Sequence, residues 1–202
     1  MPEFDALFLT ILLGYLLGSI PVAALVTRRH RLDIFSIGSG QPGAANVFLN
    51  VGRRSGMLVS AGDAAKGALS VIVASRLGVE EGWILFPTAA AIAGHWRSIF
   101  TRFRGGDGLA TLLGATIALF PLHGTFAIVI GITLGFLIRH VAHPTLWAGL
   151  ACYFLLLGRS LIYQEDIFDT LGLVMLALIV LAHIVIGHHR RRASSLPDYE
   201  AS

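Results

Sequence analysis

Long apolar runs separated by short polar segments dominate the pattern of this chain. Because about 20 helical residues cross a bilayer, these runs predict an all-α polytopic membrane protein with about seven transmembrane helices. The expected segments cover residues 4–26, 57–77, 83–100, 109–122, 125–138, 144–163 and 167–186. The fourth and fifth are short for a bilayer, so a kink near Pro121, or a merger that reduces the count to six, stays open.

Basic and acidic residues fall in alternate connections between these segments. Cytoplasmic loops carry an excess of Lys and Arg, so the pattern predicts an N-terminus outside and a C-terminus in the cytoplasm, in the bacterial plasma (inner) membrane. The basic side holds Arg28, Arg29, Arg31, Arg53, Arg54, Arg97, Arg102, Arg104, Arg139 and Arg190, Arg191, Arg192; the acidic side holds Glu80, Glu81, Glu165 and Asp166.

Composition agrees with a membrane protein. Of 202 residues, 55% are apolar and only 13% are charged, which excludes a typical soluble domain. We expect one transmembrane domain over residues 1–193 and a disordered tail over 194–202. The single Cys152 rules out an internal disulfide and gives no metal-ligand spacing, so we predict no metal and no cofactor. Membrane lipids are the expected surroundings, nucleic acid is not an expected partner, and the oligomeric state stays open.

Two glycine-rich segments lie on the predicted cytoplasmic side, at residues 38–46 and 104–108. Glycine permits positive φ and lets backbone N–H groups approach a ligand, so such a loop can cradle phosphate oxygens. The alternative is a tight turn between packed helices. Both interpretations stay open for both segments.

Several polar residues interrupt the apolar segments. Asp63 and Lys66 stand three residues apart on one helix face, where an ion pair limits the cost of each charge, and charges within a membrane are candidates for function. His95 and His183 lie near segment ends, where an interfacial or hydrogen-bonded role competes with a catalytic one. The run from His188 to Arg192 is better explained by attraction to anionic lipid head groups than by metal binding.

Taken in order, five short motifs resemble one family, the bacterial acyl-phosphate:glycerol-3-phosphate acyltransferases (PlsY). The motifs are Gly18-Ser19-Ile20-Pro21, residues 38–46, Asp63-Ala64-Ala65-Lys66-Gly67, Gly94-His95 and residues 103–111. The resemblance covers nearly the whole chain and implies seven transmembrane helices, an outside N-terminus and a cytoplasmic active site. It implies that acyl phosphate and glycerol 3-phosphate are the substrates, that the 1-hydroxyl is acylated, and that the product is lysophosphatidic acid for phospholipid synthesis.

The resemblance also implies roles for particular residues. Ser39, His95 and His183 would be catalytic, with Asn46 bracing the turn that contains Ser39. No protein nucleophile is implied, because the substrate's own phosphate would assist deprotonation. The implied substrate- and phosphate-binding residues are Gly38, Gly40, Gly43, Asn46, Lys66, Arg104, Gly105, Gly106 and Gly108.

This chain departs from the family pattern at positions where cations or amides are usual. Asp107 replaces a lysine, Phe35 and Leu49 replace arginines, and Ile186 replaces an asparagine. An acidic group beside a phosphate would repel it. Two rival hypotheses therefore stay open, namely a divergent paralogue with lost or altered acyltransferase activity and, from another class, a small-anion or lipid transporter.

Overall fold

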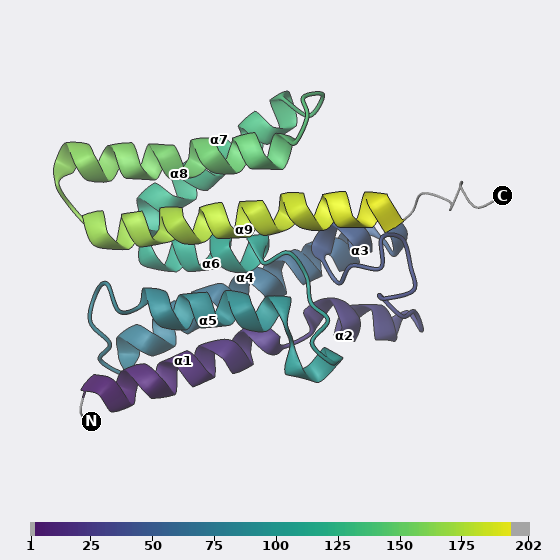
Figure 1. Cartoon of the computed structure of the whole chain (residues 1–202), viewed down its shortest axis with the longest axis horizontal. Coiled ribbons are helices and arrows are strands. Elements are labelled where there is room, and N and C mark those ends of the chain that lie inside the picture. The colour runs from purple at the N-terminus through teal and green to yellow at the C-terminus, as the bar shows by residue number, and fades with distance from the viewer. Residues whose placement is uncertain (1–2, 195–202) are drawn as a thin grey trace.

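The computed structural model describes residues 3–194, and within them every regular element is a helix. The helices, labelled in Figure 1, are α1 (Glu3–Ser19), α2 (Val22–Arg29), α3 (Ala44–Asn50), α4 (Arg53–Arg76), α5 (Leu85–Trp96), α6 (Leu109–Leu119), α7 (Pro121–Leu137), α8 (Pro144–Tyr163) and α9 (Ile167–Ser194). A single 3-10 turn covers Ile99–Thr101.

The long helices form one bundle in which the chain repeatedly crosses from end to end (Figure 1). α1 packs along α5 and α4 along α6, while α8 lies between α7 and α9. The two ends of the chain lie at opposite ends of the bundle in Figure 1, and α2 and α3 lie at the end where α9 finishes.

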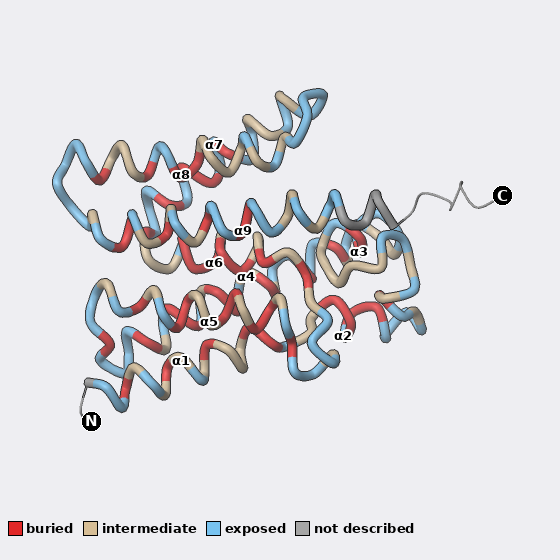
Figure 2. The backbone as a smooth tube through the Cα atoms, in the orientation of Figure 1, coloured by how far each residue is buried: buried red, intermediate tan, exposed pale blue. Residues whose placement is uncertain are grey.

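Within residues 3–194, four stretches are long and apolar enough to cross a membrane, and the protein is therefore a helical membrane protein. These stretches are Phe4–Arg29, Arg53–Arg76, Pro144–Tyr163 and Ile167–His189, with α6 and α7 as shorter apolar helices. Large apolar side chains remain exposed on the outside of the bundle, for example Phe168 at 85%. Figure 2 shows buried positions gathered along the helix contacts and exposed positions on the outward faces of α7, α8 and α9. Such apolar faces suit lipid rather than water.

The predicted segment at 144–163 coincides with α8, but the first segment does not stay in one piece. It is broken between α1 and α2 at Ile20 and Pro21. Proline has no N–H to donate, so the helical hydrogen bonding of α1 cannot continue through it. The third segment was expected to reach Phe100, but α5 ends at Trp96 and a 3-10 turn follows.

Three other boundaries differ from expectation. The helix α4 begins at Arg53, four residues before the predicted start at 57. Only Phe120 separates α6 from α7, and Pro121 occupies the first turn of α7, so the expected kink at this proline is a break between two helices. The last helix continues to Ser194, which belongs to the expected tail; the rest of that tail, 195–202, lies outside the described residues.

Glycines allow the two best-packed helix pairs to approach closely. A Cβ on Gly18 would clash with the carbonyl oxygen of Ala91 on α5, and one on Gly94 would clash with the carbonyl oxygen of Tyr15 on α1. The same reciprocal arrangement joins α4 and α6, because Gly67 lies on the Thr111 carbonyl and Gly114 on the Ala64 carbonyl. Small residues at such crossings are typical of membrane helices.

Gly114→Ala should therefore destabilise the protein by about 1–3 kcal/mol, since the added methyl group must push the α4 backbone away. Gly158→Ala on α8 is the matched control, because a Cβ there meets nothing within 4 Å. Thermal unfolding in detergent measures both. If the Gly114 variant unfolds at the same temperature as the Gly158 variant, or at a higher one, the close-contact interpretation is contradicted.

Candidate functional site

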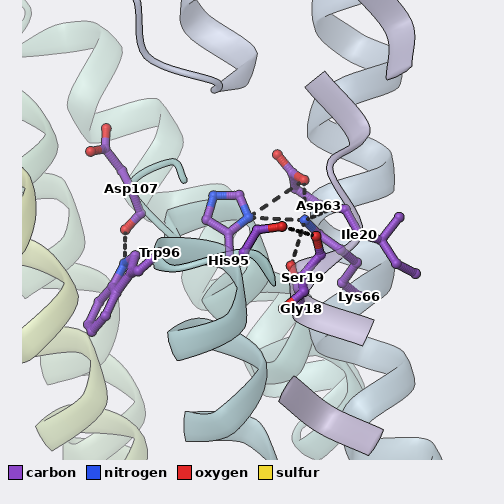
Figure 3. Close-up of polar contacts among 9 residues, drawn as sticks. Gly18, Ser19, Ile20, Asp63, Lys66, His95, Trp96 and Asp107 are labelled. Carbon is purple, nitrogen blue, oxygen red and sulfur yellow. Dashed lines mark hydrogen bonds and ion pairs between the residues drawn. The ribbon is translucent and has the colours of Figure 1, made fainter. Parts of the chain in front are cut away.

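A cluster of three polar side chains lies in the interior of the bundle (Figure 3). Lys66 Nζ lies 2.8 Å from Asp63 Oδ1 and 3.0 Å from His95 Nδ1, and His95 Nδ1 lies 3.7 Å from the same carboxylate oxygen. All three side chains are buried. The ion pair predicted from the spacing of Asp63 and Lys66 is thus confirmed, and His95 joins it because Gly94 lets α5 approach α1.

Lys66 also binds the break between α1 and α2. Its ammonium donates to the carbonyl oxygens of Gly18, at 3.2 Å, and Ile20, at 2.9 Å. An ammonium has three protons, and four acceptors already surround this one. The cavity beside the cluster measures about 20 Å³, which is room for roughly one water molecule. In this conformation Lys66 holds the helix break and offers no free donor to a substrate.

The contact with Lys66 determines which nitrogen of His95 carries a proton. An ammonium only donates, so His95 Nδ1 accepts and Nε2 carries the hydrogen of the neutral ring. Nε2 faces Gly106, where a Cβ would lie 2.5 Å from it and 2.7 Å from the carbonyl oxygen of Pro42. Gly106 is therefore the point where the His95 helix, the 105–108 turn and the first glycine loop meet.

Trp96, the next residue on α5, connects this turn to the last helix. Its indole Nε1 donates a 2.8 Å hydrogen bond to the backbone oxygen of Asp107, as drawn in Figure 3. Its ring stacks on His183 with centroids 4.6 Å apart and planes 20° from parallel. The predicted catalytic residue His183 thus lies against the aromatic neighbour of His95.

Asn46 organises the first glycine loop. Its Oδ1 accepts from the Ser39 backbone N–H at 3.3 Å, and its Nδ2 donates to the carbonyl oxygens of Ile37 and Gln41 at 3.0 Å each. Gly38 and Gly40 have φ values of +53° and +67°, a backbone region that L residues rarely adopt. The loop ends at Gly43, which begins α3, a short helix that the sequence did not predict.

The backbone N–H groups of this loop are largely used within it. Those of Gly40 and Gly43 donate to loop carbonyls, that of Gln41 reaches Ser39 Oγ at 3.4 Å, and that of Ser39 is taken by Asn46. Glycine here builds a tight turn, as in the alternative interpretation of the sequence. Ligand contacts from this conformation therefore fall to side chains.

Those side chains line a cavity of about 690 Å³ at the end of the bundle where α3 lies. Ser39, Gln41, Asn46 and Asn50 contribute polar groups from the loop and α3, and the turn contributes Asp107. Further lining comes from α3, from the connection between α7 and α8, from the start of α8 and from α9, at Leu49, Val141, Ala142, His143, Pro144, Thr145, Leu146, Leu181, Ile184, Val185 and His188. The cavity is large enough for a small ligand.

A second cavity, of about 220 Å³, is almost entirely apolar and lies between α6, α7 and α8. It shares Pro144, Thr145 and Leu181 with the large cavity, so the two are adjacent along the start of α8. A cavity lined in part by polar groups that adjoins an almost entirely apolar one suits a molecule with a polar head and a hydrocarbon chain.

The sequence-based site residues divide between two places. The cavity of about 20 Å³ beside the buried cluster is lined by Lys66, His95, Arg104, Gly105 and Gly106. The large cavity is lined by Ser39 and Asn46. Gly108, with φ +84°, starts α6 beside the Trp96 ring. The Arg104 guanidinium lies 4.0 Å from the centroid of Phe35, so a ring that replaces one of the family's arginines holds a neighbouring arginine instead.

The sequence did not point to the part of the cavity wall formed by His143 and Thr145, and it assigned His188 to lipid head groups only. His143 belongs to the connection between α7 and α8, Thr145 to the first turn of α8, and His188 lies near the end of α9. Nothing in their spacing shows that they line the same cavity as the glycine loop at residues 38–46, since this depends on how α8 and α9 pack.

Comparison with known proteins gives a consistent result. A family model described as glycerol-3-phosphate acyltransferase matches residues 8–197. A glycerol-3-phosphate acyltransferase from Geotalea daltonii is 36% identical over 84% of this chain and 86% of its own length. One from Thermus thermophilus is 36% identical over 85% and 84%. A crystal structure of PlsY, an integral membrane glycerol 3-phosphate acyltransferase in its glycerol 3-phosphate form, superposes with a TM-score of 0.75 at 26% identity, over 98% of this chain and 94% of that one.

Proposed function

Because this chain belongs to the glycerol-3-phosphate acyltransferase family, we propose that it transfers an acyl group from acyl phosphate to the 1-hydroxyl of glycerol 3-phosphate. The product is lysophosphatidic acid, and the chain is thus an acyltransferase of phospholipid synthesis. The observation that carries the proposal is the pair of adjacent cavities, because the polar one suits the phosphate and glycerol groups and the apolar one suits an acyl chain.

Ser39 contacts the polar groups of the substrates in the large cavity, while Asn46 and the glycines hold the loop that carries Ser39. His95 acts as a hydrogen-bond donor toward the Gly105–Gly106 turn, with its tautomer held by Lys66. His183 orients Trp96, which in turn holds the turn at Asp107. The acceptor hydroxyl loses its proton to a substrate phosphate oxygen as it attacks the acyl carbon, and the phosphate of the donor leaves. The chain supplies position and hydrogen bonds.

The cavity suggests a second candidate, which is a paralogue with altered or lost activity. Asp107 directs a carboxylate to the cavity wall, and Leu49 brings an apolar side chain to the same wall. A doubly anionic pair of substrates needs cations at such positions in a site of this kind.

The deciding assay mixes the purified protein with palmitoyl phosphate and glycerol 3-phosphate and measures lysophosphatidic acid directly. Palmitoyl-CoA in place of palmitoyl phosphate is the control for the donor, and we expect no product from it. Absence of product from palmitoyl phosphate at saturating glycerol 3-phosphate would overturn the proposed reaction and favour the altered paralogue.

The proposed topology has seven membrane crossings, with the N-terminus outside and the C-terminus in the bacterial cytoplasm. The active site of the protein faces the cytoplasm. This topology is supported by chain ends at opposite ends of the bundle and by the alternation of charges. A membrane-impermeant maleimide should label Glu80→Cys and Glu165→Cys in intact cells, and His30→Cys only after lysis. Cys152 is buried and gives a low background. Labelling of His30→Cys from outside would reverse the orientation.

A further inference from the structure

The large cavity has an unusual balance of charge for a site that receives phosphate esters. Among the described residues that line it, Asp107 is the only carboxylate, and there is no lysine or arginine. The only lining groups of this set that can become cationic are two histidines, His143 and His188. Arg104, the nearest arginine of the turn, lies instead over the Phe35 ring.

The two histidines come from different elements and meet at the cavity. His143 directly precedes the first turn of α8, and His188 lies near the end of α9. Their ring centroids are 6.4 Å apart and the planes are nearly perpendicular, at 87°. The ring of His189 also approaches His143, at 5.8 Å. The backbone of His143 is left-handed, with φ +56°, and this costly conformation turns the chain into α8 at the cavity wall.

The arrangement suits an anion better than a metal ion. Among the residues that the structure describes, no group of three His, Cys, Asp or Glu side chains can hold a metal. An imidazole, in contrast, donates an N–H group, and a hydrogen bond from a charged donor to a phosphate oxygen is the strong kind. His143 and His188 both line the large cavity, where a phosphate group would have room beside them.

We infer that His143 and His188 bind the phosphate group of a substrate in the large cavity and supply the positive charge that Asp107 opposes. The inference rests on the proposed function, because it assigns residues to the same site. The phosphate group belongs to glycerol 3-phosphate or to acyl phosphate. Both present the same chemistry to the two rings, and the experiment separates them.

Binding is measured first, because it does not depend on turnover. Equilibrium binding of glycerol 3-phosphate to the purified full chain, and separately of palmitoyl phosphate, is compared for wild type, His143→Gln, His188→Gln and the matching lysine variants. Glutamine keeps a donor without charge and lysine restores the charge. We expect each glutamine variant to lose about 10-fold or more in affinity for one of the two ligands, and each lysine variant to stay within about 3-fold of wild type.

His140→Gln is the matched control, because His140 is an exposed histidine in the same connection that bonds Arg139 and does not line the cavity. Asp107→Asn, introduced into the wild-type protein and into each glutamine variant, should raise the affinity for the phosphate ligand that the histidines bind, because it removes the opposing negative charge. The ligand whose affinity falls identifies which phosphate the histidines hold.

The outcomes separate this inference from the proposed reaction. Glutamine variants that bind both ligands like wild type would overturn the inference even if the protein makes lysophosphatidic acid. Lysine variants as weak as the glutamine variants would also overturn it, because charge would not be the cause. Histidine-dependent binding in a protein that makes no product would keep the inference and refute the reaction, and a wild type that binds neither ligand would refute both.

Discussion

Lys66→Met alone should lower the free energy of unfolding by about 3–5 kcal/mol, because it leaves the Asp63 carboxylate buried without its cation. The same change removes the donor that holds the carbonyl groups of Gly18 and Ile20. Unfolding of the purified protein in detergent, followed by far-UV circular dichroism as the temperature rises, measures the loss.

Two variants make this result specific to the buried pair. Arg76→Met removes a cation from the exposed end of the same helix and should have little effect. The double variant Asp63→Leu with Lys66→Met should recover part of the loss, because it leaves no unpaired charge in the interior. A Lys66 variant as stable as the Arg76 variant would show that the cluster does not hold the helix break.

Asp107→Lys should raise the affinity for glycerol 3-phosphate about 5- to 150-fold, which corresponds to an attraction of about 1–3 kcal/mol. Among the described residues no cation lies within 4.0 Å of the Asp107 carboxylate, and Asp107 is one of the residues that line the large cavity. Leu49 lines the same cavity, so the double variant with Leu49→Arg should bind more tightly still. Equilibrium binding and acyl transfer are measured together.

The control for added charge is Glu80→Lys, which makes the same exchange in the connection between α4 and α5, away from the cavity. Asp107→Asn separates the loss of repulsion from the gain of attraction. Unchanged affinity in the Asp107→Lys protein would mean that the phosphate binds elsewhere. Robust turnover by wild type would remove the inactive-paralogue hypothesis, whatever the variants do.

The sequence predicted the membrane helices well where the local signals were complete. The segment at 144–163 coincides with α8 because Pro144 starts the helix and the polar Gln164 follows it. Pro21 marks the break between α1 and α2, since proline cannot continue a helix. This break was not predicted from the sequence, because the apolar run continues on both sides of the proline. The short helix α3 was not predictable from seven residues, because it depends on packing against α4, where Val47 and Val59 share one cluster of buried residues.

The candidate site was predictable in its parts more than in its assembly. The spacing of Asp63 and Lys66 predicted their ion pair. The pattern of glycines left a phosphate cradle and a tight turn both open, and the structure has the tight turn, with Gly38 and Gly40 at positive φ. Spacing could not show that the carbonyl group of Gly18 meets Lys66, because this depends on how closely α1, α4 and α5 pack. His143 and the glycine loop lie further apart still in sequence, and no local rule predicts that they line one cavity.

The break between α1 and α2 has a consequence for how the chain enters the bilayer during synthesis. Asp63 and Lys66 lie in the middle of α4, where insertion of a charged residue costs roughly 2.5–3.5 kcal/mol. When α4 leaves the ribosome, His95 has not yet been made, and the carbonyl groups of Gly18 and Ile20 are the partners already in the membrane. We therefore expect α4 to stay beside the first hydrophobic segment in the insertion machinery until α5 arrives, so that these helices integrate as a group.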